Sequence, residues 1–198
     1  MSISRIRSNP PPSLLIHCTT EMSHTRRPLK LAYCLYPNLT ILDFVGPAEF
    51  FAALEPRNNP LNPDSSKPSP PQVEGTYFSH TLDPVVGEAG PALIPTRTYQ
   101  EVLDKFEQYD IFLVPGGVSC RVWFSETVSL MLGSVFPGVN GRPEAVDPSL
   151  LKFIKQQAPG AKYILTVCTG SWIFAGTGLL NKRRATTNKA AFKTVVVC

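Results

Sequence analysis

The chain has 198 residues, the length of one domain with some sequence to spare. With 43% hydrophobic and 17% charged residues, it has enough apolar side chains for a core and too little charge for a disordered chain. The formal net charge of +4 is mild, and no basic stripe with interleaved aromatic residues occurs, which argues against a nucleic-acid partner.

The cysteines and histidines show no metal-ligand pattern. Five cysteines are spread widely without a C-x-x-C pair, and there are only three histidines, so we expect no metal site. Free thiols in a reducing compartment are the simplest interpretation, which favours a cytoplasmic protein. The cysteines are Cys18, Cys34, Cys120, Cys168 and Cys198.

Two segments have the composition of unstructured sequence. Residues 1–27 carry Arg and Ser with a single acidic residue, Glu21, which predicts a disordered leader, with a transit peptide as the alternative. Residues 56–73 are rich in Pro, Asn and Ser and predict an exposed loop insertion. We therefore expect one folded domain over residues 28–198, interrupted by this loop.

One stretch has the length and neutrality of a membrane span. Residues 163–181 carry no charge and could cross a bilayer. However, Thr, Ser and Gly residues interrupt the stretch in the way that a strand, a turn and a helix would. We therefore expect no membrane association.

The apolar runs predict alternating strands and helices. Strands are expected at residues 29–35, 75–81, 109–114, 161–167 and 185–187, those at 29–35, 109–114 and 161–167 being buried. Helices are expected from about Val45, with Pro47 in the first turn and Phe50, Phe51 and Leu54 on the apolar face; after a cap at Thr98; from about Ser125 to Gly133; after a cap at Asp147; and after Cys168. This alternation predicts an α/β fold, with a doubly wound, mostly parallel sheet and helices on both faces.

The strongest local feature surrounds Cys168. A predicted strand ends at Val167, and small residues lead from Cys168 directly into a helix. A nucleophile on such a strand-to-helix turn projects above the edge of the sheet. Helix N–H groups there lower the pKa of a thiol. The alternative is an inert buried cysteine that packs like a small hydrophobic residue, and this feature alone does not decide between the two.

Two further segments end on the same edge of the predicted sheet. Gly116 and Gly117 follow a buried strand, and two glycines let backbone N–H groups turn toward a developing oxyanion, although an ordinary tight turn is the alternative. Asp43 lies between apolar residues after the first strand, where it could equally be a turn or cap carboxylate. In a doubly wound sheet these strand ends lie near the crevice where ligands bind.

Together, the segments LDFVGPAEFF, DIFLVPGG and TVCTGSWIFAGTGLLNKRRATTNKAAF, in this order, resemble the DJ-1/PfpI superfamily, which is class I glutamine-amidotransferase-like. The closest branch is isonitrile-hydratase-like, and the resemblance covers residues 29–193. It implies a flavodoxin-like fold with the cysteine on its elbow, and many relatives form homodimers. By motif position it implies Cys168, Asp43 and Thr169 as catalytic residues, and Gly116, Gly117 and Thr169 as oxyanion or substrate-binding residues.

The chain departs from the family pattern in two places. Relatives with a catalytic dyad or triad carry histidine in the ATTH segment, where this chain has Asn188. Because asparagine cannot act as a general base, this argues against a Cys–His protease or amidase mechanism. Relatives also continue with further strands and a long helix beyond the position of Cys198. We therefore expect C-terminal elements to be missing and the short form to be poorly soluble or partly unfolded.

The resemblance makes a cysteine-dependent hydratase the leading functional hypothesis, that is, a lyase that converts isonitrile-like small molecules to N-substituted formamides. The Cys168 thiolate would attack the isonitrile carbon and Asp43 would supply a proton, with no metal or organic cofactor. One alternative is a glyoxalase-like enzyme acting on 2-oxoaldehydes, which Asn188 makes less favourable. Another is a non-catalytic redox-sensing or ligand-binding module in which Cys168 is oxidised. The expected partners are a small-molecule substrate and a second copy of the chain.

Overall fold

The computed structural model describes residues 27–58, 71–117, 143–189 and 192. The expected leader, except residue 27, most of the proline-rich insertion and the helix expected at 125–133 lie outside the described residues. The same is true of Cys18, Cys120 and Cys198.

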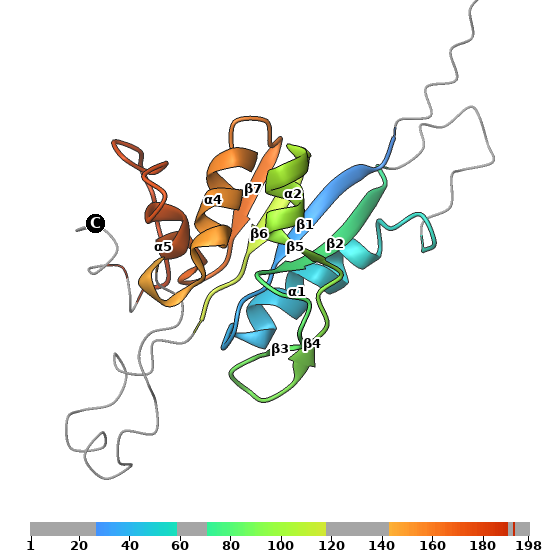
Figure 1. Ribbon diagram of the computed structural model, residues 1–198, viewed down its shortest axis with the longest axis horizontal. Coiled ribbons are helices and arrows are strands. Elements are labelled where there is room, and N and C mark those ends of the chain that lie inside the picture. The colour runs from blue at the N-terminus through green and yellow to red at the C-terminus, as the bar shows by residue number, and fades with distance from the viewer. Residues whose placement is uncertain (1–26, 59–70, 118–142, 190–191, 193–198) are drawn as a thin grey trace, which may run out of the picture.

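A five-stranded parallel sheet forms the centre of the molecule, in the order β5-β2-β1-β6-β7 (Figure 1). Its strands are β1 (Leu29–Cys34), β2 (Val73–Ser79), β5 (Arg97–Thr98), β6 (Ile111–Val114) and β7 (Tyr163–Thr166). Every neighbouring pair is parallel. Two short antiparallel strands, β3 (Val85–Val86) and β4 (Ala92–Leu93), form a separate pair. The predicted α/β class with a mostly parallel sheet is confirmed.

The helices cover both faces of this sheet. Among the described residues they are α1 (Ile41–Ala52), α2 (Tyr99–Lys105), α4 (Pro148–Gln157) and α5 (Gly170–Ala175), with a 3₁₀ turn, η2, at Pro143–Ala145. The crossover through α1 runs from β1 to β2, whereas those through α2 and α4 run the opposite way across the sheet. Because such crossovers are right-handed, α1 lies on one face and α2 and α4 lie on the other, where these two pack together (Figure 1).

Local capping chemistry fixes two helix starts as predicted. The Thr98 hydroxyl accepts the N–H of Glu101 at 3.2 Å, which caps α2. The Asp147 carboxylate accepts the N–H of Ser149 at 2.8 Å and caps α4, with Pro148 in the first turn. Each cap satisfies a backbone donor that has no partner within the helix.

Helix α1 differs from its prediction at its start and on its apolar face. It begins at Ile41 and not near Val45, so Pro47 lies inside the helix and not in its first turn. Proline lacks the N–H that would bond to the carbonyl four residues earlier, and the helix continues past this gap. Phe50, expected on the apolar face, is 72% exposed, and the buried residue of this helix is Phe44.

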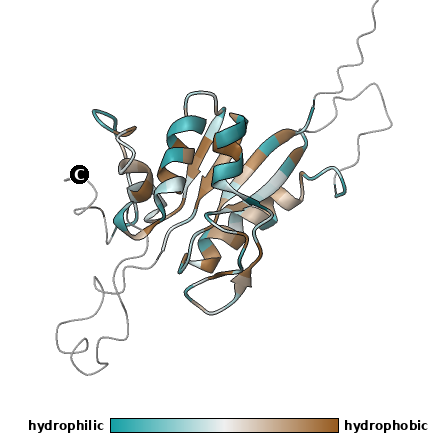
Figure 2. Cartoon of the chain, in the orientation of Figure 1, coloured by the Kyte–Doolittle hydropathy of each residue, from teal (hydrophilic) through white to brown (hydrophobic). Residues whose placement is uncertain are grey.

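The central strands supply most of the core. Strand β6 and the last four residues of β1 are buried, since both strands lie inside the sheet and are covered by helices. Figure 2 shows these strands in brown, while polar residues cover much of the outer surface of α2 and α4. From α4, the side chains of Leu150, Phe153 and Ile154 are fully buried.

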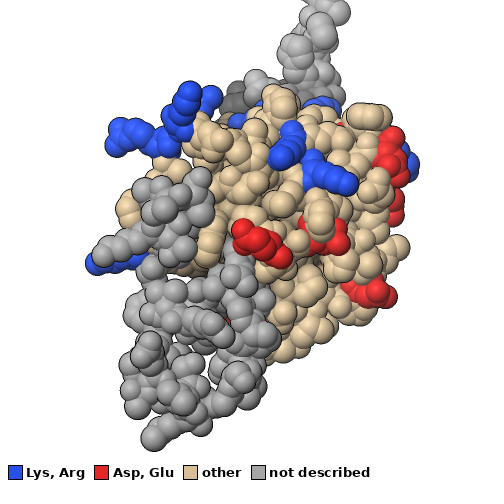
Figure 3. Space-filling view, turned by 60° about the vertical axis from the view of Figure 1, so that its left-hand side comes forward, with Lys and Arg blue, Asp and Glu red and all other residues tan. Residues whose placement is uncertain are grey.

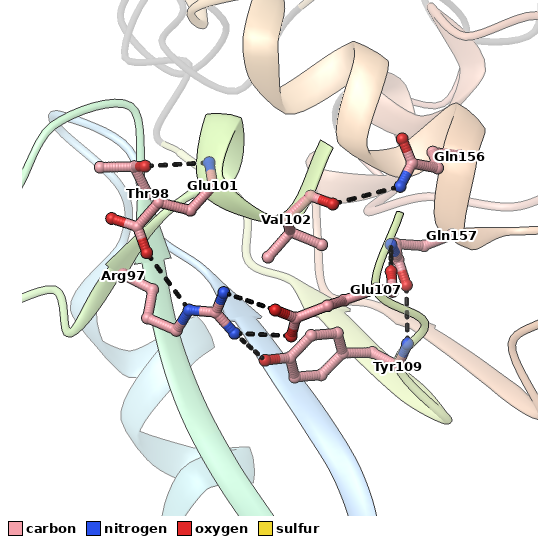
Figure 4. Close-up of polar contacts among 8 residues, drawn as sticks. All are labelled: Arg97, Thr98, Glu101, Val102, Glu107, Tyr109, Gln156 and Gln157. Atoms are coloured by element: carbon pink, nitrogen blue, oxygen red, sulfur yellow. Dashed lines mark hydrogen bonds and ion pairs between the residues drawn. The ribbon is translucent and has the colours of Figure 1, made fainter. Parts of the chain in front are cut away.

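A polar cluster holds the edge strand β5 to the rest of the domain (Figure 4). The Arg97 guanidinium donates two hydrogen bonds to Glu107, at 2.8 and 2.9 Å, and a longer one to Glu101 at 3.3 Å. The Gln157 side chain on α4 accepts the N–H of Tyr109 at 2.7 Å and donates to the Glu107 carbonyl at 2.8 Å. The cluster therefore joins β5, α2, α4 and the segment before β6.

Charges of both signs occur on the surface. On the face drawn in Figure 3, described Lys and Arg side chains and Asp and Glu side chains both occur, with uncharged surface between many of them. No single-sign field therefore covers the described part of this face.

Two expectations about the last strands are wrong. Strand β7 was expected to be buried, but Tyr163 is 60% and Ile164 39% exposed. The reason is its place at the sheet edge, where β6 is its partner among the described residues. Residues 185–187, expected as a strand, have no strand structure and form no described sheet pairing. The uncharged residues 163–181 form β7, a turn and α5, and none of the described helices has the length and hydrophobicity to span a membrane.

Asp110 joins the amino-terminal ends of three strands. Its carboxylate accepts two hydrogen bonds from Arg27, at 2.8 and 3.1 Å, and one from the Lys30 N–H at 3.0 Å. It also forms an ion pair with Lys162 at 3.0 Å. Burial alone would raise the pKa of Asp110, but these donors outweigh it and lower the pKa to about 2. The carboxylate is therefore bound in its charged form and ties β1, β6 and β7 together.

We predict that Asp110→Asn lowers the free energy of unfolding by roughly 2 kcal/mol at neutral pH. Because the folded-state pKa is depressed, the stabilisation is present above the unfolded-state pKa and is lost as the pH falls through about 2. The difference in the free energy of unfolding between wild type and variant, measured by urea unfolding, should therefore become smaller from about pH 5 to pH 2. Asp83→Asn, a change to an exposed carboxylate, is the control. A stability difference between wild type and Asp110→Asn that stays constant with pH would contradict the role given to the charged Asp110.

Candidate functional site

Cys168 lies on a sharp turn between strand β7 and helix α5. Its φ angle is +53°, in the left-handed region that costs a residue with a side chain about 1–2 kcal/mol. The hydroxyls of Ser171 and Thr187 both donate to the Cys168 carbonyl, at 3.0 and 2.9 Å. The side chain is half-buried. The predicted strand–turn–helix arrangement is therefore present, with the thiol at the carboxyl end of the sheet.

Asp43 reaches the same place from the other side of β6. Backbone contacts tie the loop after β1 to the turn after β6: the Thr40 N–H donates to the Gly116 carbonyl at 2.8 Å, and Leu39 forms a bridge with Gly117. The carboxylate of Asp43, which lies in the first turn of α1, accepts a hydrogen bond from the Gly116 N–H at 3.2 Å. The Cys168 side chain lies close enough to this carboxyl to lower its pKa.

Gly116 lies where these segments converge. A Cβ atom added there would be 2.6 Å from Asp43 Oδ2, 2.9 Å from Cys168 Cβ and 3.0 Å from the Thr169 nitrogen. Only a residue without a side chain permits this approach. The carboxyl ends of β1, β6 and β7 therefore meet around one glycine. Between β1 and β6 the direction in which successive strands are added to the sheet reverses, and ligands bind at such a point in sheets of this kind.

Thr169 is fully buried, and its hydroxyl holds the glycine turn. It accepts the Gly117 N–H at 3.0 Å and donates to the Gly117 carbonyl at 2.9 Å. The amides of Gly116 and Gly117 are thus both bonded to side chains of the site. To bind an oxyanion, the two amides must first break these bonds to the side chains. The predicted roles of Gly116, Gly117 and Thr169 stay predictions.

The surroundings of Asp43 favour its protonated form. Burial raises the pKa of Asp43, and the hydrogen bond from Gly116 and the nearby Cys168 side chain offset part of that rise. A carboxyl that keeps its proton to higher pH can donate it to a neighbouring sulfur or substrate atom. Glu49, on the same helix, is exposed and lies outside this arrangement.

Asn188 also reaches the reactive sulfur, which sequence reasoning missed. Its side-chain Nδ2 donates to Cys168 Sγ at 2.7 Å. In the sequence alone, this position shows only the loss of a histidine. The available signal was the motif itself, because the residue after ATT is where relatives carry the histidine partner.

The other described cysteine has a different environment. Cys34 is fully buried in β1, and burial raises the pKa of its thiol, with only a partial offset from a hydrogen bond to Tyr99. Cys34 is thus held neutral. Among the described residues no group of three or more His, Cys, Asp and Glu side chains could hold a metal ion.

Comparison with known proteins shows which proteins this chain resembles. The profile of the DJ-1/PfpI family matches residues 133–197. Over 162 residues the chain is 30% identical to the isonitrile hydratase of Pseudomonas putida, an alignment that covers 82% of this chain and 53% of that enzyme. The chain is thus similar to the DJ-1/PfpI family and spans about half of the length of this relative.

Solved structures agree on the fold. A ThiJ/PfpI family protein from Pseudomonas syringae superposes with a TM-score of 0.51 at 24% identity, covering 84% of this chain and 55% of that one. A two-domain protein from Anabaena variabilis, with DJ-1/ThiJ/PfpI-like and ferritin-like domains, gives a TM-score of 0.58 at 15% identity, with coverages of 85% and 38%. The flavodoxin-like arrangement predicted from the sequence is confirmed.

We predict that Cys168 is alkylated well before Cys34. Its thiol is half-exposed on the turn, whereas the Cys34 thiol is buried and held neutral. Brief labelling with substoichiometric iodoacetamide, followed by mass mapping, measures the order. Preferential labelling of Cys34 or Cys120 would contradict the prediction.

We predict that Asp43→Asn shifts the alkylation of Cys168 to lower pH and removes one step from its pH profile. An ionised Asp43 repels a neighbouring thiolate, whereas asparagine keeps a neutral donor at every pH. The measurement is the labelling rate from about pH 4 to pH 10. Glu49→Gln, an exposed carboxylate on the same helix, is the control, and a profile unchanged by Asp43→Asn would assign Asp43 a structural role.

Proposed function

We propose that the chain is a cysteine-dependent hydratase that converts isonitriles to N-substituted formamides. The observation that carries the proposal is that Cys168 and Asp43 converge at Gly116, where an added Cβ would lie 2.6 Å from Asp43 Oδ2 and 2.9 Å from Cys168 Cβ, while burial raises the pKa of Asp43. A nucleophile and a proton donor thus lie within reach of one substrate atom. The 30% identity to an isonitrile hydratase supports this choice of substrate.

The first half of the proposed reaction forms a covalent intermediate. The Cys168 thiolate attacks the terminal carbon of the isonitrile, and a carbon–sulfur bond forms. The negative charge that develops on this carbon takes the proton of Asp43. The products of this half are a thioimidate on Cys168 and an ionised Asp43.

The second half returns the enzyme to its starting state. The Asp43 carboxylate takes a proton from water as the water oxygen adds to the thioimidate carbon, and it passes this proton to the nitrogen. The carbon–sulfur bond then breaks and the Cys168 thiolate leaves. The hydroxyl proton goes back to Asp43 as the carbonyl of the formamide forms, so one isonitrile and one water give one formamide.

The half-exposed thiol also supports a second candidate, a redox-sensing module. A solvent-accessible cysteine can be oxidised by peroxide to a sulfenic acid without turning over any substrate. Both candidates need a reduced thiol, which favours the cytoplasm as the location. They differ in whether an isonitrile is consumed.

We predict that the full chain releases formamide from a simple alkyl isonitrile, that Cys168→Ala abolishes this turnover, and that Asp43→Asn lowers kcat by about 10²–10⁴-fold. Glu49→Gln should leave kcat unchanged. Product release is followed by mass spectrometry over time. Peroxide oxidation of Cys168 without isonitrile turnover would favour the redox module, and turnover of a 2-oxoaldehyde alone would favour the glyoxalase-like alternative.

A further inference from the structure

Two consecutive residues from a distant part of the chain bond to Cys168. Thr187 donates its hydroxyl to the Cys168 carbonyl at 2.9 Å, and Asn188 donates its side-chain amide to Cys168 Sγ at 2.7 Å. The Ser171 hydroxyl, on α5, also donates to this carbonyl, at 3.0 Å. Thr187 and Asn188 thus bond to the main chain and to the sulfur of Cys168. This pair of bonds limits how far the Asn188 amide can move relative to the thiol.

We propose that Asn188 is a catalytic residue that stabilises the Cys168 thiolate by donating an amide N–H to its sulfur, and that Thr187 positions Asn188 for this purpose. A hydrogen bond to a charged acceptor is roughly twice as strong as one between neutral groups, so the amide favours the thiolate over the thiol. The asparagine amide neither gains nor loses a proton near neutral pH. Asn188 therefore acts as a donor across the whole working range.

The titratable groups near the sulfur belong to other elements. Among the described residues these are the Asp43 carboxyl of α1 and the Tyr36 phenol that follows β1. Tyr36 is buried and donates to the Pro115 carbonyl at 2.9 Å, and burial raises its pKa, so it stays neutral. The cations closest in sequence to Asn188, at positions 184 and 189, have exposed side chains. The pH dependence of the thiol thus comes from Cys168 and Asp43, and Asn188 shifts its midpoint.

The role of Asn188 in turnover rests on the proposed hydratase function. The sulfur loses its charge when it bonds to the isonitrile carbon and regains it when the thioimidate adduct breaks down. A donor that prefers the charged sulfur thus favours the departure of the thiolate, and it slightly weakens the thiolate as a nucleophile. Because the amide transfers no proton, each proton transfer of the cycle falls to Asp43.

The test measures the pH dependence of Cys168 alkylation by iodoacetamide, which needs no substrate. Asn188→Ala should raise the midpoint by about one pH unit, which is a roughly tenfold loss of thiolate at neutral pH. Thr187→Val should shift the midpoint in the same direction by a smaller amount. Thr186→Val, a change to the exposed neighbouring threonine, is the matched control and should leave the midpoint unchanged.

Two further variants keep the proposal testable if Asn188→Ala does not melt cooperatively. Asn188→Asp preserves the size but replaces the donor with an acceptor, so it should raise the midpoint further. Asn188→His should add a titration step near the histidine pKa of about 6.5. An unchanged midpoint in a folded Asn188→Ala or Asn188→Asp protein would overturn the proposal, as would an equal shift in Thr186→Val.

The outcome is separable from the hydratase function. If the wild-type chain turns over no isonitrile but Asn188→Ala still shifts the alkylation midpoint, the hydratase proposal fails and the thiolate donor stands. If turnover is observed and the midpoint does not move, the hydratase stands and Asn188 has only a structural role.

Discussion

The close approach at Gly116 is the constraint on which the site depends. Strand β6 lies between β1 and β7, so the turn that follows β6 separates the start of helix α1, which carries Asp43, from the turn carrying Cys168. Any side chain at this position would collide with both residues. Gly170 meets a similar constraint, since a Cβ there would clash with the carbonyl of Val114. Because neither glycine has a side chain, the turn after β6 and the start of α5 can approach closely, and helix α5 can begin directly after the cysteine turn.

The same three strands are fixed at their opposite ends by charge. Asp110 ties β1, β6 and β7 at the amino-terminal edge through Arg27, Lys30 and Lys162, while hydrogen bonds around Gly116 tie the carboxyl ends. Strands held at both edges cannot slide past one another without breaking one of these networks. This rigidity is what permits Cys168 to keep a left-handed backbone conformation that an unconstrained residue would leave.

Features that depend on local chemistry were predictable from the sequence, and features set by distant partners were not. The strand at residues 111–114 follows from a continuous apolar run, and the caps at Thr98 and Asp147 follow from side chains that bond within three residues. By contrast, the two-residue strand β5 exists through its pairing with β2, and the exposure of β7 reflects its edge position. The contact of Asn188 with Cys168 spans 20 residues, so motif position was its one trace in the sequence.

The chemistry of that contact restricts what the site can do. A histidine beside the thiol would take the thiol proton and later deliver it, whereas an amide only donates a hydrogen bond. Hydrolysis of an unactivated amide needs a base for the nucleophile and an acid for the leaving amine, which a histidine supplies in turn. With Asn188 in that place, Asp43 is the group beside Cys168 whose raised pKa suits proton transfer. The proposed hydration of an isonitrile fits such a site, because the proton given to the carbon is replaced from water and one carboxyl can carry each transfer.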